Sequence, residues 1–362
     1  MKHAGDSNFD LSMTAAVASG RICRWLLAAV LLIATLTGCG GGGSSTPRVQ
    51  GPPSSSLADR FDFLWNTFDQ QYPYFDYKGV DWNALRSTYR PQALAASGDQ
   101  QLAATIGQML GNLNDLHVHL VDPGGKQIAT TTEKHFINFD AAVWQQYLQS
   151  RGSNIQQHSG FITGSLGGVP YLAIQTWGSN NVSISDLDAA LEAYRSVPHM
   201  IIDVRMNGGG DSSIAYKFAG RFADQTHSTE SVRFRNGPGH GDFGPLQQIQ
   251  VTPRGPWQFT GQVMLLIGHG CASSNEEFVA AMRRIPTVTI VGDDFTGGHS
   301  GNPALFDLGN GWQFTVSRWQ NFYEPEHVMI EDNGIPSSVF ISSSASDFQQ
   351  GKDPVLDYAM TH

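Results

Sequence analysis

The chain has 362 residues, of which 40% are hydrophobic, and it carries a formal net charge of −10 with only 15% charged residues. This length supports one large domain and a small one, and the acidic balance argues against a nucleic-acid-binding surface. The three cysteines, Cys23, Cys39 and Cys271, are too few and too scattered for a disulfide framework or a zinc site.

An apolar stretch, Trp25–Leu36, follows two arginines near the N-terminus. It is too short to span a membrane permanently, and it ends in LTGC, which resembles the end of a bacterial lipoprotein signal. In such signals the cysteine, here Cys39, becomes the lipidated first residue; the alternative is an ordinary signal peptide with a cysteine there by chance. We expect a signal over residues 1–39, a flexible Gly/Ser/Pro-rich tether over residues 40–56, and a lipid-anchored location in the bacterial cell envelope, periplasmic or at the outer membrane.

Three amphipathic stretches predict a small helical domain over residues 57–116. They are Leu57–Gln70, with Ser56 as its N-cap, Asp81–Tyr89 and Gln100–Leu113. From residue 117 onward short apolar runs alternate with helical stretches. This alternation predicts an α/β core over residues 117–362, with a mostly parallel sheet and flanking helices.

The elements expected in this core follow the chain in order. The strands are His117–Val121, Val169–Gln175, Met200–Val204, Val232–Arg235, Val263–Ile267 and Val288–Val291, with a hairpin formed by Ala304–Asp307 and Gln313–Ser317. The helices are Ser185–Tyr194, Ser212–Phe222, the amphipathic run Phe278–Ile285 and Asp353–Met360. The pattern of Asn138–Leu148 fits either type of element.

The strand Val263–Ile267, a glycine-rich turn and the helix that follows form a unit in which Ser273 lies where the turn becomes the helix. One interpretation is a capping box, with Ser273 as the N-cap and Glu276 three residues later. The other is a nucleophile, because a serine at a helix start lies beside free backbone N–H groups that can stabilise an oxyanion. The residues of this unit leave both open.

Two histidines, His117 and His119, lie where the helical part meets the α/β part, and they would share one face of a strand. A His-x-His metal site is one interpretation, but no third ligand is evident. A second is a general base whose ring is oriented by a carboxylate. A third is a pair of hydrogen-bonded histidines at a domain junction.

Two further segments carry residue types that acyl transfer needs. The loop Gly208–Gly210 follows a buried strand but lacks dinucleotide-binding spacing, so it is either a tight turn or part of an oxyanion hole. Glu331 precedes the turn Asn333–Pro336. A serine, a histidine and a carboxylate on separate loops of one sheet are the set that acyl-transfer chemistry uses.

Six blocks occur in this order between Leu57 and the C-terminus: WNTFDQQYPYFDYKGVDWNALRSTYRP, DLHVHL, DVRMNGGGD, GCASSNEEF, VGDDFTGGHSG and IEDNGIP. Together they resemble the serine peptidase family of C-terminal processing proteases, tricorn core protease and interphotoreceptor retinoid-binding protein. The resemblance implies a ClpP/crotonase-like core behind the helical N-terminal domain.

The resemblance also assigns roles, with the family nucleophile falling on Ser273 when Glu276 is aligned. The C-terminal processing branch uses a lysine base in a segment that here reads Gly297-Gly298-His299, without lysine. The tricorn-like branch uses a histidine and a glutamate, which fall on His117 and Glu331. The implied oxyanion donors are the loop of Gly208 and Gly209 and the backbone N–H of Ser274.

The chain departs from the tricorn-like pattern at several positions. Leu116 stands where that branch has a serine, and Ser337-Ser338 stands in place of Pro-Asp. Between Val121 and Phe161 the chain is too short to hold the PDZ domain that many relatives insert, so substrate selection by such a domain is not expected.

These features predict a lipid-anchored envelope serine endopeptidase that acts on peptide or protein substrates through Ser273, His117 and Glu331. The predicted mechanism needs no metal or cofactor, and the oligomeric state is left open. Two alternatives use the same fold: a non-catalytic ligand-binding protein, and an esterase with the same three residues.

Overall fold

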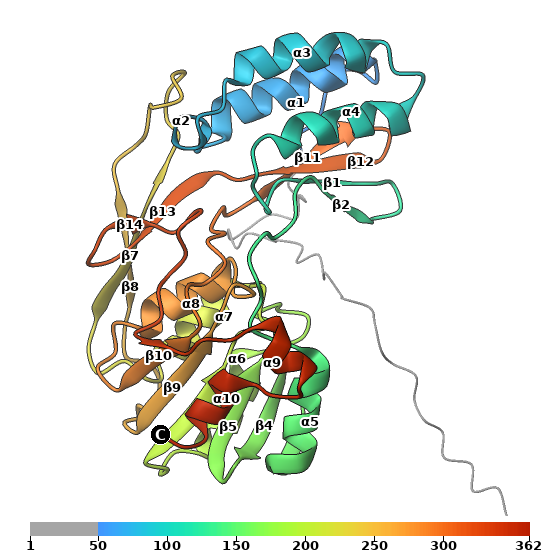
Figure 1. Ribbon diagram of the computed structural model, residues 1–362. Coiled ribbons are helices and arrows are strands. Elements are labelled where there is room, and N and C mark those ends of the chain that lie inside the picture. The colour runs from blue at the N-terminus through green and yellow to red at the C-terminus, as the bar shows by residue number, and fades with distance from the viewer. Residues whose placement is uncertain (1–49) are drawn as a thin grey trace, which may run out of the picture. The chain divides into compact units, whose positions relative to one another are not determined.

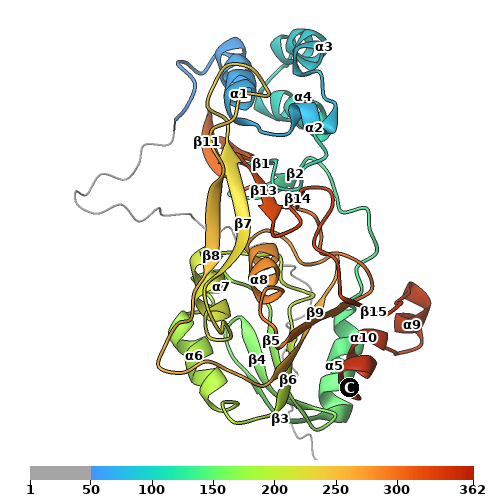
Figure 2. The same cartoon turned by 90° about the vertical axis from the view of Figure 1, so that its left-hand side faces the viewer.

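The computed structural model describes residues 50–362 (Figures 1 and 2). The predicted signal, Cys39 and most of the predicted tether therefore lie outside the described residues. Over residues 50–362, no helix is both long enough and apolar enough to cross a membrane.

A seven-stranded sheet forms the centre of the α/β part, in the order β15-β10-β9-β6-β5-β4-β3. The five strands from β15 to β5 are parallel, whereas β4 and β3 join antiparallel at one edge. The predicted fold class, an α/β core with a mostly parallel sheet, is thereby confirmed. The strands are β3 (Gly152–Gln157), β4 (Phe161–Leu166), β5 (Val169–Ile174), β6 (His199–Asp203), β9 (Gln262–Ile267), β10 (Val288–Gly292) and β15 (Val339–Phe340).

Helices cover both faces of this sheet, because its central strands are apolar on both sides (Figure 2). On one face Ile202 and Leu265 pack with α6 (Ile184–Glu192), α7 (Ser212–Ala219) and α8 (Ser274–Met282). On the other face the neighbouring residues Ile201 and Leu266 pack with α5 (Ala141–Arg151) and α10 (Pro354–Ala359), and α9 (Ala345–Gln349) precedes α10. The period-two alternation of each strand thus divides the core into two layers.

The N-terminal helices share a separate core with a second sheet (Figure 1). The helices are α1 (Leu57–Gln71), α2 (Phe75–Lys78), α3 (Trp82–Leu94) and α4 (Asp99–Gly111). Ser56 caps α1 as predicted, since its side chain accepts a hydrogen bond from the backbone N–H of Asp59. The sheet is antiparallel, in the order β11-β12-β1-β2, with strands β1 (His119–Val121), β2 (Gln127–Ala129), β11 (Ala304–Gly309) and β12 (Trp312–Val316).

A third sheet, also antiparallel and in the order β14-β13-β7-β8, was not expected from the sequence. Its strands are β7 (His227–Phe234), β8 (Gln247–Val251), β13 (Trp319–Tyr323) and β14 (Val328–Met329). Tyr323 and Val328 of this sheet pack against the hydrophobic core that contains α8, so the third sheet covers part of that core.

Two local predictions need correction or completion. The predicted strand His117–Val121 is wrong in its first part, because β1 begins at His119 and His117 lies in a turn. The side chain of Asp115 forms this turn by accepting a hydrogen bond from the backbone N–H of His117 at 2.8 Å, and an Asx turn of this kind competes with strand pairing. The ambiguous segment Asn138–Leu148 is mostly helix α5, which Asp140 caps.

Candidate active site

Ser273 occupies the turn between β9 and α8 in a positive-φ backbone conformation outside the left-handed helical region, with φ 58° and ψ −133°. A non-glycine residue in such a conformation costs about 1–3 kcal/mol, and positions of this kind are concentrated at functional sites. The Ser273 side chain makes no capping hydrogen bond; instead its carbonyl oxygen accepts from the backbone N–H of Glu276 at 2.7 Å. The capping-box interpretation is therefore wrong, and the hydroxyl is left free for other chemistry.

The Glu276 carboxylate, which a capping box would direct back to Ser273, is buried and holds the neighbouring loop. It accepts hydrogen bonds from the hydroxyl of Thr296 (2.5 Å) and from the backbone N–H groups of Gly298 and His299 (2.8 Å each). Burial raises the pKa of Glu276 to about 7. This loop also binds the Ser273 turn, because the backbone N–H of Ser273 donates to the carbonyl of His299 at 2.8 Å.

The glycine loop after β6 packs directly against Ser273. Gly209 has φ +107°, and a Cβ at this position would lie 2.7 Å from the Cβ of Ser273 and 2.9 Å from the carbonyl oxygen of Ala272. Real Cβ atoms do not approach so closely, so glycine is required here by both conformation and space. At Gly208, by contrast, a Cβ would meet open space.

The predicted oxyanion donors differ in their availability. The N–H of Gly209 donates to the side chain of Asn207 at 2.9 Å, so it is already used. The N–H groups of Gly208 and Ser274 make no hydrogen bond with any residue between 50 and 362. Two free backbone donors therefore lie in the segments that pack together around Ser273.

His117 is a nearly buried imidazole, with 13% of its side chain exposed. Burial lowers the pKa of His117 to about 4, against the opposing effect of the Asp115 carboxylate. The Nδ1 atom lies 3.9 Å from Oδ1 of Asp115, whose other oxygen accepts a hydrogen bond from the hydroxyl of Ser317 at 2.7 Å. The ring is consequently neutral near pH 7 and is able to accept a proton.

Glu331 is fully buried and is held from two sides. One oxygen lies 2.9 Å from Nζ of Lys78, and the other accepts a hydrogen bond from the N–H of Ser300 at 3.2 Å. Burial raises the pKa of Glu331, the Asp115 carboxylate raises it further, and the Lys78 ammonium opposes both. The acid nearest to the His117 ring is thus Asp115, whereas Glu331 faces Lys78.

The loop Gly297–Gly301 connects these three sites. The carbonyl of His299 accepts from the N–H of Ser273, and the N–H of Ser300 donates to Glu331. At Gly301 a Cβ would lie 3.0 Å from Nδ1 of His117, so the loop passes directly beside the imidazole. The structure therefore brings Ser273, His117 and Glu331 around a single loop, although they are far apart in sequence.

Two further histidines, His119 and His299, each have a side-chain partner. His119, which the metal interpretation paired with His117, has its Nδ1 3.0 Å from the hydroxyl of Thr315. His299 has its Nε2 2.7 Å from the carboxylate of Glu133. Across residues 50–362, no group of three or more His, Cys, Asp or Glu side chains is arranged to hold a metal ion.

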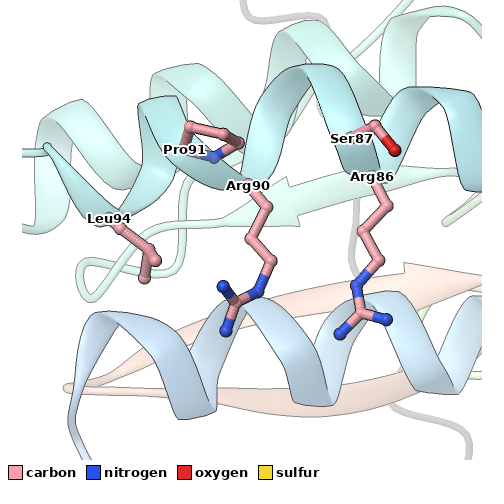
Figure 3. A pocket seen from close by; sticks show the side chains of 5 residues that line it. All are labelled: Arg86, Ser87, Arg90, Pro91 and Leu94. Carbon is pink, nitrogen blue, oxygen red and sulfur yellow. The ribbon is translucent and has the colours of Figure 1, made fainter.

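Two surface pockets differ in how near they lie to these residues. The larger, about 390 Å³, lies along α3, where Arg86 and Arg90 extend toward α1 and both bind Asp62 (Figure 3). It contains none of the predicted site residues. The second, about 280 Å³, includes His269 of the turn before Ser273; its other lining residues are His135, Phe136, Asp293, Asp294, Phe340, Ser342 and Ser343.

Sequence reasoning missed several residues of the site. Asp115 had a detectable signal, because aspartate side chains often accept a hydrogen bond from the backbone N–H two residues further on, which here is that of His117. Lys78, Ser317 and Glu133 had none, since each reaches the site through a contact between distant segments.

Comparisons with known proteins match two parts of the chain to family models. Residues 168–339 match the model described as peptidase family S41, and residues 53–111 match the tricorn protease C1 domain. A curated protein named putative tricorn protease homolog 2, from Streptomyces coelicolor, is 24% identical over 217 residues. That match covers 60% of this chain but only 16% of the Streptomyces coelicolor protein.

Solved structures extend the similarity to most of the chain. A putative peptidase from Parabacteroides merdae has a TM-score of 0.74 and 26% identity, covering 85% of this chain and 96% of its own. Mature CPAF has a TM-score of 0.61 and 12% identity, covering 84% of this chain and 96% of its own, and its likeness is one of fold.

The two glycines of the loop after β6 give a matched test of this geometry. Gly209→Ala should lower the free energy of unfolding by at least about 1–2 kcal/mol, because alanine is strained at positive φ and its Cβ would overlap the Ser273 turn. Gly208→Ala, which meets open space, should change it by no more than about 1 kcal/mol. Urea unfolding measures both, and equal losses would contradict the close approach of Gly209 to Ser273.

Proposed function

Since this chain belongs to peptidase family S41, we propose that it is a serine endopeptidase with Ser273 as nucleophile, His117 as general base and Glu331 as the supporting carboxylate. The observation that carries the proposal is the state of Ser273. Its hydroxyl is released from capping, its backbone is held in a strained turn, and the N–H of the next residue is free. A serine on a strained strand-to-helix turn is how several hydrolases present a nucleophile.

The proposed reaction has two stages. In the first, Oγ of Ser273 attacks the scissile carbonyl carbon while neutral His117 takes the hydroxyl proton, and the carbonyl oxygen becomes an oxyanion. The N–H groups of Ser274 and Gly208 stabilise that oxyanion. The C–N bond then breaks, and the imidazolium gives its proton to the leaving amine, which leaves an acyl group on Ser273.

In the second stage a water molecule attacks the acyl carbonyl carbon. His117 takes a proton from the water and returns it to Oγ of Ser273 as the ester bond breaks, which releases the carboxylic acid product. The imidazolium that forms in each stage is stabilised by the carboxylates of Asp115 and Glu331. Asp115 is the acid next to the imidazole ring. One of its oxygens accepts a hydrogen bond from the backbone N–H of His117, and the other accepts one from the hydroxyl of Ser317.

The non-catalytic alternative has less support. A carrier protein needs neither a serine with a free, strained turn nor a buried neutral imidazole, and both cost stability. The esterase alternative uses the same residues, so peptide and ester substrates have to be compared directly.

We further propose that the enzyme is lipid-anchored in the bacterial cell envelope through Cys39, on the basis of the apolar stretch Trp25–Leu36 and the tether that follows. Cys39→Ser should release the protein from the membrane fraction or leave its signal uncleaved. Mass spectrometry of the mature wild-type N-terminus provides the direct measurement, and an N-terminus without lipid would refute the anchor.

Substitution of Ser273 separates catalysis from stability. Ser273→Ala should reduce peptide turnover by about a thousandfold or more, because the nucleophile is lost. The free energy of unfolding should change by no more than about 1 kcal/mol, because the hydroxyl makes no capping bond that could be lost. Steady-state kinetics and urea unfolding of the same preparation give the two quantities.

Ser274→Ala is the matched control for position. Its hydroxyl donates to the carbonyl of Gly210 at 2.7 Å, while the backbone N–H that the proposal uses is unaffected by the substitution. This variant should still cleave peptide, with a stability loss of about 1 kcal/mol. An inert Ser274→Ala beside an active Ser273→Ala would move the nucleophile by one residue and refute the assignment.

A further inference from the structure

Lys78, the last residue of α2, inserts its side chain between the segments that carry Glu331 and His117. Only 6% of the side chain is exposed. Its Nζ lies 2.9 Å from Oε1 of Glu331 and 2.8 Å from Oδ1 of Asp332, and it donates to the carbonyl of Asn114 at 3.1 Å. A lysine with nearly all of its side chain buried is uncommon unless the charge is paired, and here the pairing is with the proposed catalytic site.

This lysine is unsuited to act as a base. Burial lowers the pKa of Lys78, but the carboxylates of Glu331 and Asp115 reverse that effect and raise it above its usual value. The ammonium is therefore protonated at neutral pH, and its three N–H directions are taken by Glu331, Asp332 and Asn114. Its contribution is a fixed positive charge.

The positive charge of Lys78 offsets part of the negative charge of two buried acids, Asp115 and Glu331. Asp115 and Glu331 are both buried, and the Asp115 carboxylate raises the pKa of Glu331. Among the other groups facing Glu331, His299 adds positive charge when it is protonated, and its pKa is raised mainly by its hydrogen bond to Glu133, against burial. The hydroxyl of Tyr77 binds the Glu331 backbone, and Asp332 is a third acid. The titratable groups around Glu331 are Lys78, Asp115, His299, Asp332, Tyr72, Tyr74 and Tyr77.

Lys78 also holds the turn that leads to His117. Asn114 has φ 46°, a left-handed conformation, and its carbonyl is one of the three acceptors of the ammonium. The next residue, Asp115, forms the Asx turn that places His117. A single side chain from α2 therefore contacts both the segment of the base and the supporting carboxylate.

We propose that Lys78 is a positioning residue of the active site: its ammonium pairs with the buried Glu331 carboxyl group and fixes the turn that carries His117. This inference rests on the proposed peptidase function and extends it to a residue of the N-terminal helices. The contacts of the ammonium are with Glu331, Asp332 and Asn114, so Lys78 acts through the Glu331 carboxyl group and the Asn114 turn.

The test is the pH dependence of kcat/KM in Lys78→Met and Lys78→Arg. Without the cation the pKa of Glu331 rises, and the carboxylate becomes protonated at a higher pH. The acid limb of the Lys78→Met variant should therefore move to a pH higher by about one to three units. At a pH below the new limb, this shift corresponds to a decrease in kcat/KM of about 10- to 1000-fold relative to the wild type. Activity should recover as the pH is raised, and KM should change little because the loss is in kcat.

Lys78→Arg keeps the charge and should restore most of the wild-type acid limb, which a purely structural role in packing would not predict. Lys134→Met is the matched control. The ammonium of Lys134 donates to the side-chain oxygen of Asn114 at 2.6 Å but makes no contact with Glu331. Its pH profile should coincide with that of the wild type. Coincident acid limbs of the wild type and Lys78→Met, or failure of arginine to restore the limb, would overturn the proposal.

If Lys78→Met does not fold, the same question is answered in the Glu331→Gln background, where no buried carboxylate is left unpaired at that position. Lys78→Met should then no longer move the acid limb of kcat/KM, because the carboxyl group on which the ammonium acts is absent. An upward shift of the acid limb in this background would refute the proposal. A fully active Ser273→Ala, by contrast, would refute Ser273 as the nucleophile on which the proposed function depends, so the two failures are distinguishable.

Discussion

The site depends on the strained, positive-φ backbone of Ser273 and on the contacts that hold it in that conformation. Such a conformation persists only when the surrounding structure over-determines it. Here the buried Glu276 carboxylate fixes the backbone of Gly298 and His299, and the His299 carbonyl in turn holds the Ser273 N–H. Gly209 packs on the other side, at a distance that excludes any side chain. The turn is therefore held between two loops, and its hydroxyl is not needed for holding it.

The second feature of the site is the balance of its buried charges. Asp115 and Glu331 are two buried acids, Lys78 is one buried ammonium, and His117 is neutral in the resting state. The Asp115 carboxylate favours the protonated imidazole, but burial outweighs it and lowers the pKa of His117 to about 4. The remaining stabilisation of the imidazolium has to come from the negative charge that develops on the substrate in the transition state.

The sequence predicted the parts of this arrangement that depend on local patterns. The strand Val263–Ile267 and the helix after Ser273 carry the apolar periodicities expected of them, and both are present. The Ser-x-x-Glu pattern fits a capping box and a nucleophile turn equally well, since the difference lies in where Glu276 finds its partners. Those partners are on a loop more than 20 residues away, beyond the reach of a local pattern.

Other parts could not be read from the sequence for the same reason. His117 was placed on a strand because its neighbours alternate, but the side chain of Asp115 forms a turn first. No sequence pattern assigned a role to Lys78, and only its contacts with the Glu331 segment show that its side chain is buried. The sheet β14-β13-β7-β8 consists of strands that alternate weakly or are short, so only part of β7 was expected.

The most direct test of the account is the position at which a fluorophosphonate probe attaches. A serine hydrolase forms a covalent phosphonyl ester at its nucleophile, so the folded protein should be labelled with one probe molecule, and peptide mass spectrometry should place it on Ser273. Labelling should be lost in Ser273→Ala and strongly slowed in His117→Ala. An unlabelled protein that is correctly folded, or a label on another serine, would contradict the claim that the strained turn presents a nucleophile.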